Sequence, residues 1–237
     1  MESKNRGKGN PCTRGLLIAI EGGDGAGKAT QTALLTEKLI AAGQNAHKVS
    51  FPAYGQPSCT MVESYLRGEF GTDPNAVNAY AASMFYAVDR YATFKKNWGN
   101  LYQDGSIIIA DRYTTANALF QVTKVAKIER KSYLDWLYDL EYNKMGLPRP
   151  DLVVYLDVPP EVSERMRTQR EADTNTQADI HENLAMQQKV RESALYVAEH
   201  GAWKIVNCVD DKNHMRSIEE INADIMELVQ HTLETKC

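Results

Sequence analysis

The chain has 237 residues, of which 43% are hydrophobic and 24% are charged. That length suits one large domain or two small ones, and the apolar content suffices for a buried core. The 27 lysines and arginines against 31 aspartates and glutamates give a net charge of −4, so no overall positive field attracts nucleic acid. The apolar runs, such as residues 16–20, are far shorter than the ~20 residues that cross a bilayer. We therefore expect neither a nucleic-acid partner nor a membrane span.

The N-terminal residues 1–14 are polar and basic. A secretory signal would need ~7–15 apolar residues after such a start, and Glu21 interrupts the apolar run here. We expect a flexible tail over 1–14, one domain over 15–237, and no export signal. The four cysteines have no C-x-x-C spacing, which predicts reduced thiols in a cytoplasmic protein rather than disulfides or a zinc site. They are Cys12, Cys59, Cys208 and Cys237.

Short apolar segments alternate with longer amphipathic ones along the rest of the chain. The expected strands are residues 16–20, 46–51, 106–110, 152–158 and 204–206. The expected helices are residues 28–42, 74–99, 132–145, 182–200 and 217–233. Several strands are apolar throughout, which is typical of a parallel sheet covered by helices on both faces. The alternation predicts a doubly wound α/β domain.

A glycine-rich segment joins the first strand to the first helix. Gly22, Gly27 and Lys28 have the G-x-x-x-x-G-K spacing of a phosphate-binding loop. In such a loop, backbone N–H groups face the phosphates, the lysine adds a positive charge, and the helix N-terminus points to the same place. The predicted phosphate site comprises Gly22, Gly23, Asp24, Gly25, Ala26, Gly27, Lys28, Ala29 and Thr30.

One position departs from this motif. A serine or threonine normally follows the lysine, and its hydroxyl ligates magnesium, whereas this chain has Ala29. Thr30 lies ~100° further around the helix axis and does not simply substitute. We therefore expect Mg²⁺ to be held mainly by nucleotide oxygens, waters and carboxylates from elsewhere in the chain.

Asp111 and Arg112 follow the third apolar strand, at the edge where parallel α/β sheets bind ligands. Asp111 is a candidate ligand for magnesium or its water. Arg112 offers the planar fork that suits a phosphate. Beside a phosphate loop, we interpret this pair as functional rather than as a tie between a strand and a helix.

Tyr86 and Arg90 lie one helical turn apart and so share a face. Such a pair suits stacking on a nucleobase and hydrogen bonding to its edge. The other interpretation is a core aromatic beside a solvated arginine, and the segment taken alone favours this second interpretation. The same two interpretations stay open for Asn117, Phe120 and Gln121, which follow at helical spacing.

Residues 165–181 are polar, without apolar periodicity, and begin with an arginine cluster. In phosphoryl-transfer enzymes an arginine-bearing mobile lid closes over the phosphates and neutralises charge in the transition state. We interpret this segment as such a lid rather than as a solvated loop. Its candidate catalytic cations are Arg165, Arg167 and Arg170, with Arg170 as the first choice.

Six motifs together resemble the thymidylate kinase family, whose members phosphorylate dTMP with ATP. In order they are EGGDGAGK (21–28), FPAYGQPS (51–58), FYAVDR (85–90), DRYTTANALFQ (111–121), MGLPRPD (145–151) and ADIHE (178–182). The resemblance covers residues 15–233 and implies a three-layer P-loop kinase fold with a parallel five-stranded sheet and a mobile lid. It also implies ATP and dTMP as substrates, Mg²⁺ as the cofactor and a homodimer packed through helices.

The resemblance also implies roles for individual residues. Lys28 and the loop hold ATP phosphates, and Arg112 grips the acceptor phosphate. Tyr86 stacks on thymine in place of the family's usual phenylalanine, and Arg90 reaches the O4 edge of the base. The implied acceptor site comprises Asp24, Phe51, Pro52, Tyr54, Tyr86, Arg90, Arg112, Asn117, Phe120 and Glu182. The candidate metal ligands, directly or through water, are Asp24, Asp111 and Glu182.

Three positions depart from the family pattern. Gly25 replaces an arginine that some members carry in the phosphate loop, and the arginine-rich lid resembles the class that supplies this cation from the lid. Ala53 stands where many members have an arginine or another polar residue. Phe120 stands where many members have a tyrosine against the sugar's C2′, so a steric contact is expected without the hydroxyl.

Two other functions are compatible with a phosphate loop. A deoxynucleoside kinase of the same fold would need a carboxylate base for the 5′-hydroxyl, whereas Arg112 and the FPAYG segment favour a monophosphate acceptor. A GTPase-type switch would need N-K-x-D, and its nearest match ends in Gly146. The sequence therefore favours dTMP phosphorylation.

Overall fold

The computed structural model describes residues 14–73, 75–165 and 184–236. Its centre is a parallel sheet of five strands in the order β2-β3-β1-β4-β5. These strands are β1 (Leu16–Gly22), β2 (Ala46–Ser50), β3 (Ile107–Asp111), β4 (Leu152–Asp157) and β5 (Lys204–Asn207). All five predicted strands are therefore confirmed within two residues.

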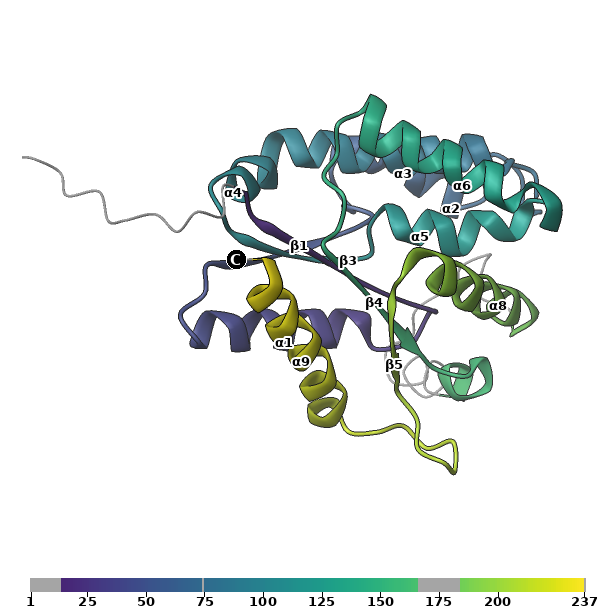
Figure 1. Cartoon of the computed structure of the whole chain (residues 1–237). Helices are drawn as coiled ribbons and strands as arrows, with labels where there is room; N and C mark the ends of the chain where they lie inside the picture. The colour runs from purple at the N-terminus through teal and green to yellow at the C-terminus, as the bar shows by residue number, and fades with distance from the viewer. Residues whose placement is uncertain (1–13, 74, 166–183, 237) are drawn as a thin grey trace, which may run out of the picture.

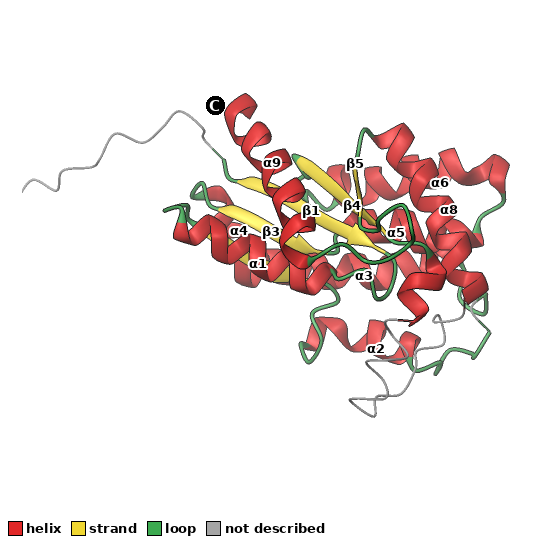
Figure 2. Ribbon diagram, turned by 90° about the horizontal axis from the view of Figure 1, so that it is seen from below, coloured by secondary structure: helices red, strands yellow, loops and turns green. Residues whose placement is uncertain are grey.

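Helices cover both faces of the sheet, which makes three layers (Figure 1). On one face lie α1 (Lys28–Ala41) and α9 (Ile218–Lys236), which cross in front of the sheet in Figure 2. The opposite face carries α3 (Ala79–Thr93), α4 (Gly99–Gln103), α5 (Thr114–Phe120), α6 (Arg130–Tyr138) and α8 (Leu184–Gly201). The short helix α2 (Thr60–Leu66) lies at the edge of this second layer. The α/β prediction is confirmed.

The central strands are buried on both faces because each helical layer packs on one set of alternating side chains. Ile18 and Ile20 of β1 join a cluster that includes Leu35 of α1 and Ile225 of α9. Leu17, the next residue along, joins the opposite cluster with Phe94, Trp98 and Ile108. Every residue of β1 and β3 is buried, as expected for unalternated apolar strands.

Two predicted helices are interrupted. Over 74–99 the structure has α3, capped by the Asn78 side chain, which accepts a hydrogen bond from the Ala81 N–H. A π-helical segment, Phe94–Trp98, then joins α3 to α4. Over 132–145, α6 ends at Tyr138 and a second π-helical segment, Asp139–Lys144, continues the chain. π-Helical turns insert a residue that a 3.6-residue period does not reveal, and they often occur at functional sites.

No described helix is both long and apolar enough to cross a membrane. The N-terminal tail, apart from Arg14, and most of the predicted lid lie outside the described residues. Cys59 and Cys208 are buried free thiols.

The packing predicts which isoleucines stabilise the fold. Ile109 of β3 is fully buried, whereas Ile128 is 93% exposed. We expect Ile109→Ala to lower the free energy of unfolding by ~2–5 kcal/mol, because it leaves a cavity in the core. Ile128→Ala, the matched control, should change it by less than ~0.5 kcal/mol. Urea denaturation measures both, and equal effects would contradict this description of the core.

Candidate active site

The carboxyl ends of β1 and β3 bring the phosphate loop and the Asp111–Arg112 turn together. In the parallel register Ile20 is paired with Asp111, and the Arg112 N–H donates to the Ile20 carbonyl at 3.1 Å. Gly22 ends β1, and α1 begins six residues further on at Lys28. Both motifs therefore emerge side by side at the edge where α/β sheets bind ligands.

The loop backbone turns through conformations that favour glycine. Gly25 and Gly27 have φ angles of 78° and 83°, a left-handed region that side chains rarely adopt. Gly27 is also the N-cap of α1. Ala29 and Thr30 are both exposed on the first turn of that helix. The loop thus has the form expected of an anion site at a helix N-terminus.

Lys28 folds back over the loop. Its Nζ donates to the Gly23 carbonyl at 2.6 Å, and the residue is only 8% exposed. Burial, together with the nearby positive charge of Arg112, lowers the pKa of Lys28 to about 8, although Asp24 and Asp111 act in the opposite direction. A negatively charged phosphate would stabilise the protonated lysine and raise this pKa again.

Asp24 ties the loop to the other side of the site. Its Oδ1 accepts a hydrogen bond from Arg112 Nη2 at 2.5 Å, and its Oδ2 accepts one from Gln187 Nε2 at 2.9 Å. Burial acts to raise the pKa of Asp24, but Arg112 and Lys28 outweigh it and lower the pKa below its ordinary value. No local sequence pattern marks Gln187 of α8, since only the fold brings it to the loop.

Arg112 is held from two further directions. Its guanidinium lies 4.7 Å from the centre of the Phe120 ring, a distance at which an arginine interacts favourably with an aromatic face. Its backbone has a φ of 64°, the left-handed region that is uncommon for residues other than glycine. The guanidinium therefore has a defined position before any ligand binds.

Glu21, near the end of β1, is a second site residue that no sequence pattern predicted. It is fully buried, and its Oε1 accepts hydrogen bonds from the Tyr113 N–H at 2.9 Å and from Thr115 Oγ1 at 2.5 Å. Among the described residues no group donates to its Oε2. Burial raises the pKa of Glu21. This carboxylate fixes the backbone that follows Arg112 against the strand that precedes the phosphate loop.

A cavity opens beside the phosphate loop and the Asp111–Arg112 turn. Every predicted acceptor residue within the described part of the chain lines it: Asp24, Phe51, Pro52, Tyr54, Tyr86, Arg90, Arg112, Asn117 and Phe120. Five further residues complete the lining, and the sequence pointed to only one of them, Gln121. The other four are Leu66, Ala116, Lys124 and Met186. The structure thus brings together side chains that are far apart in sequence into a pocket with aromatic walls and several cations.

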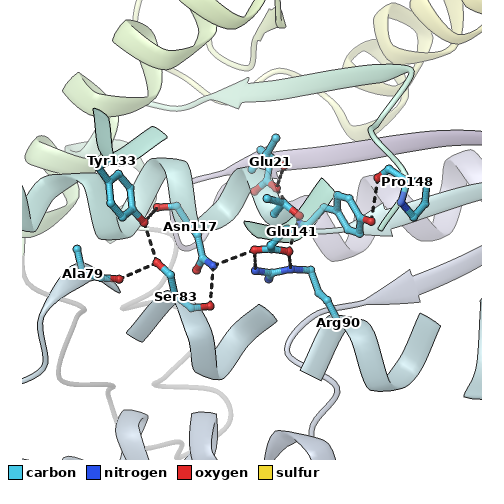
Figure 3. A network of polar contacts seen from close by, with 11 residues as sticks. Glu21, Ala79, Ser83, Arg90, Asn117, Tyr133, Glu141 and Pro148 are labelled. Carbon is cyan, nitrogen blue, oxygen red and sulfur yellow. Dashed lines mark hydrogen bonds and ion pairs between the residues drawn. The ribbon is translucent and has the colours of Figure 1, made fainter. Parts of the chain in front are cut away.

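Arg90 is not a solvated arginine. It is 1% exposed, and its guanidinium makes a two-point ion pair with Glu141, from Nε at 2.7 Å and from Nη2 at 2.5 Å. Burial acts to lower the pKa of Arg90, but the Glu141 carboxylate raises it above its ordinary value. Figure 3 shows this pair next to Asn117. Glu141, which lies in the second π-helical segment, carried no signal in the sequence.

Outside the phosphate loop, the predicted site residues that are not among the described cavity lining are Asp111, the three lid arginines and Glu182. Asp111 is 8% exposed and lies near Lys28. Arg165 donates through Nη2 to the Asn213 carbonyl at 3.3 Å and does not line the cavity. Arg167, Arg170 and Glu182 lie outside the described residues.

The carboxylates present fit a magnesium ion that keeps most of its waters. Among the described residues no three His, Cys, Asp or Glu side chains form a metal cluster. Mg²⁺ is usually held by one or two carboxylates together with substrate phosphates. Asp24 already accepts from Arg112 and Gln187, whereas no described hydrogen bond or ion pair engages the Asp111 side chain. Asp111 is therefore the better placed of the two to accept a bond from a metal-bound water.

The family of the chain follows from comparison with known proteins. A family model described as thymidylate kinase matches residues 20–225. The chain belongs to the thymidylate kinase family. The thymidylate kinase of Mycobacterium tuberculosis (strain CDC 1551 / Oshkosh) is 31% identical over 207 residues, which cover 84% of this chain and 95% of that protein. The probable thymidylate kinase of Thermococcus onnurineus is 33% identical over 223 residues, which cover 92% of this chain and 98% of that protein.

The fold is shared with a solved member of this family. A thymidylate kinase structure from Candida albicans superposes with a TM-score of 0.69 at 21% identity and covers 92% of each chain. The phosphate loop and the family membership together identify the chain as a kinase, a phosphotransferase that uses ATP.

The lowered pKa of Lys28 predicts that the protein takes up a proton when it binds ATP at high pH. At pH 9 most Lys28 is neutral in the free protein, because its pKa is about 8. Phosphates favour the charged form, so binding should take up close to one proton at pH 9. Calorimetry in buffers of different ionisation enthalpy measures this uptake, and Lys28→Met should abolish it. Equal uptake in both proteins would show that another group titrates.

Proposed function

We propose that this chain transfers the terminal phosphoryl group of ATP to dTMP, forming dTDP. One observation carries the proposal: Arg112 lies between the phosphate loop and the aromatic cavity, bonded to Asp24 of the loop and stacked on Phe120 of the cavity. A phosphate bound to Arg112 would therefore lie next to phosphates bound by the loop. The curated relatives named above carry the same activity in their names.

The proposal assigns the donor and acceptor phosphates to different groups. Lys28 and the loop N–H groups bind the ATP phosphates and neutralise charge on them. Arg112 exchanges its bond to Asp24 for the acceptor phosphate, whose geometry suits its planar fork. Because these groups are held in place before reaction, they stabilise the developing charge with little reorganisation.

The base and sugar occupy the rest of the cavity. Tyr86 and Phe51 supply aromatic walls, Phe120 packs against the sugar, and Arg90 with Asn117 reads the edge of the base. Pro52 and Tyr54 also line the cavity, and the proposal places them near the acceptor phosphate. Mg²⁺, when bound, would neutralise charge on the phosphates, with Asp111, Asp24 and Glu182 as the candidates to hold it or its waters.

A nucleoside acceptor is less well supported. Such a substrate needs a free carboxylate to take the proton of its 5′-hydroxyl. Among the described residues that line the cavity, Asp24 is the sole carboxylate, and Arg112 and Gln187 occupy its oxygens. The cavity therefore favours a monophosphate over a nucleoside.

The source of a second catalytic cation stays a prediction. Gly25 has no side chain to offer, and an added Cβ there would approach the Ser163 carbonyl to 3.1 Å. Arg165, Arg167 and Arg170 therefore remain the candidates for neutralising charge on the transferred phosphoryl group. The buried free thiols Cys59 and Cys208 support a cytoplasmic location, where cysteines stay reduced.

A second copy of the chain is the proposed partner. Tyr80, Met84, Val88 and Tyr91 lie on one face of α3 and are 37% to 53% exposed. This face points away from the side of α3 that carries Tyr86 and Arg90, because the mean directions of the two sets differ by about 135° around the helix at 100° per residue. A two-fold dimer buries the same surface of both copies, so this exposed apolar face supports the proposal of a homodimer packed through α3.

The substrate assignment is tested by a steady-state screen with ATP and magnesium. The acceptors are dTMP, thymidine, dUMP and dCMP, and we expect kcat/KM for dTMP to be at least tenfold above that for thymidine. Lys28→Ala serves as the control, since losing a phosphate-binding cation should cost ~10²–10³ in rate. A protein that prefers thymidine, or that uses another monophosphate tenfold better than dTMP, would contradict the proposal.

The dimer is tested with a charge on the apolar face. Val88→Glu should convert the dimer into a monomer, because a buried unpaired carboxylate disfavours association. Ile40→Glu is the matched control, since Ile40 is also about half exposed (55%) but lies on α1 across the sheet. Light scattering after size exclusion gives the mass, and a dimeric Val88→Glu protein would place the interface elsewhere.

A further inference from the structure

Figure 3 shows a buried polar network, two members of which, Arg90 and Asn117, line the cavity. At its centre is Glu141, which is fully buried and does not itself line the cavity. Arg90 of α3 and Asn117 of α5 line the cavity and also contact Glu141. Glu141 therefore acts on any ligand only through these two side chains.

The carboxylate of Glu141 uses both oxygens. Its Oε1 accepts from Arg90 Nη2 at 2.5 Å and from Asn117 Nδ2 at 3.4 Å. Its Oε2 accepts from Arg90 Nε and from Thr114 Oγ1, both at 2.7 Å. Ionised carboxylates accept and do not donate, so every neighbour must turn a donor toward Glu141.

This requirement fixes what Arg90 presents to the cavity. Its Nε and one terminal nitrogen point at Glu141, and among the described residues no group accepts from Nη1. A guanidinium has no acceptor atoms. The group that Arg90 can offer to a ligand is therefore a donor in a fixed position.

The same requirement fixes the orientation of the Asn117 amide. Its Nδ2 faces two acceptors, the Glu141 carboxylate and the Ser83 carbonyl, at 3.4 and 3.3 Å. Ser83 is itself held, since its Oγ bonds the Ala79 carbonyl and the Tyr133 hydroxyl at 2.7 Å each. Asn117 therefore keeps its Oδ1, an acceptor, for the ligand.

We propose that Glu141 is a positioning residue that selects pyrimidines with a 4-keto group over those with a 4-amino group. It holds Arg90 as a donor and Asn117 as an acceptor at the base end of the cavity. Thymine and uracil present the complementary edge, an O4 acceptor beside an N3–H donor, whereas cytosine presents an N4–H₂ donor beside an N3 acceptor. This inference rests on the proposed function, because it assumes that a pyrimidine monophosphate occupies the cavity.

The test compares kcat/KM for dTMP, dUMP and dCMP in the wild type and in Glu141→Gln. Glutamine keeps the shape of the side chain but turns an NH₂ group toward a donor of Arg90, Asn117 or Thr114. Arg90 and Asn117 are then no longer held with a donor and an acceptor, respectively, toward the ligand. The ratio of kcat/KM for dTMP to that for dCMP should fall at least tenfold. The ratio for dTMP to dUMP, which share the same edge, and the KM for ATP should change less than threefold.

Asp139→Asn is the matched control, because Asp139 lies in the same π-helical segment with its carboxylate at the surface. It should leave all three ratios unchanged. A folded Glu141→Gln protein that keeps the wild-type ratio of dTMP to dCMP would overturn the proposal. A wild type that does not phosphorylate dTMP would instead refute the proposed function, so the two failures are distinguishable.

A second variant covers the case in which Glu141→Gln alone does not fold. Asn117→Asp places a carboxylate against that of Glu141 and should lower kcat/KM for dTMP at least a hundredfold. Adding Glu141→Gln leaves one negative charge in the network. The new amide can donate to the new carboxylate at the cost of the Arg90 Nη2 bond, while the amide oxygen still accepts from Arg90 Nε and Thr114 Oγ1. The double variant should recover at least tenfold. A double variant no better than Asn117→Asp overturns the proposal.

Discussion

The parallel pairing of β1 with β3 is the constraint on which the site depends. It places the end of one strand, which becomes the phosphate loop, beside the end of the other, which becomes the Asp111–Arg112 turn. The buried carboxylate of Glu21 reinforces this placement, because it accepts from the backbone and side chain of the residues that follow Arg112. A donor site and an acceptor site on different segments thereby become neighbours.

Each arginine of the cavity is held by a carboxylate, and the two pairs differ in exposure. Arg112 and Asp24 remain partly accessible, with side chains 19% and 28% exposed, so an incoming phosphate can replace Asp24. The Arg90 and Glu141 side chains are only 1% and 0% exposed, and removing one partner would leave an unpaired buried charge at high cost. The Arg112–Asp24 pair can therefore open when a ligand binds, whereas the Arg90–Glu141 pair holds its hydrogen-bonding groups in fixed positions. This contrast follows from burial rather than from residue type.

The sequence predicted those features whose signal is local. Short apolar segments located all five strands, although β2 and β5 are only partly buried, and the spacing of Gly22, Gly27 and Lys28 located the phosphate loop. The helix over 74–99 was predicted as continuous because a π-helical turn at Phe94 leaves the apolar pattern nearly intact. Glu141 and Gln187 were missed for a different reason: their partners, Arg90 and Asp24, lie 51 and 163 residues away. Only the tertiary fold makes these side chains neighbours.

The central claim is that one cavity binds a nucleotide by its phosphate at Arg112 and by its base at Arg90 and Asn117. A crystal structure of the complex with dTMP and a non-hydrolysable ATP analogue tests it most directly. The account predicts the dTMP phosphate on the Arg112 guanidinium and the thymine O4 within hydrogen-bonding distance of Arg90, with the Arg90–Glu141 pair intact. A reversed nucleotide, or a base bound away from Arg90 and Asn117, would contradict it.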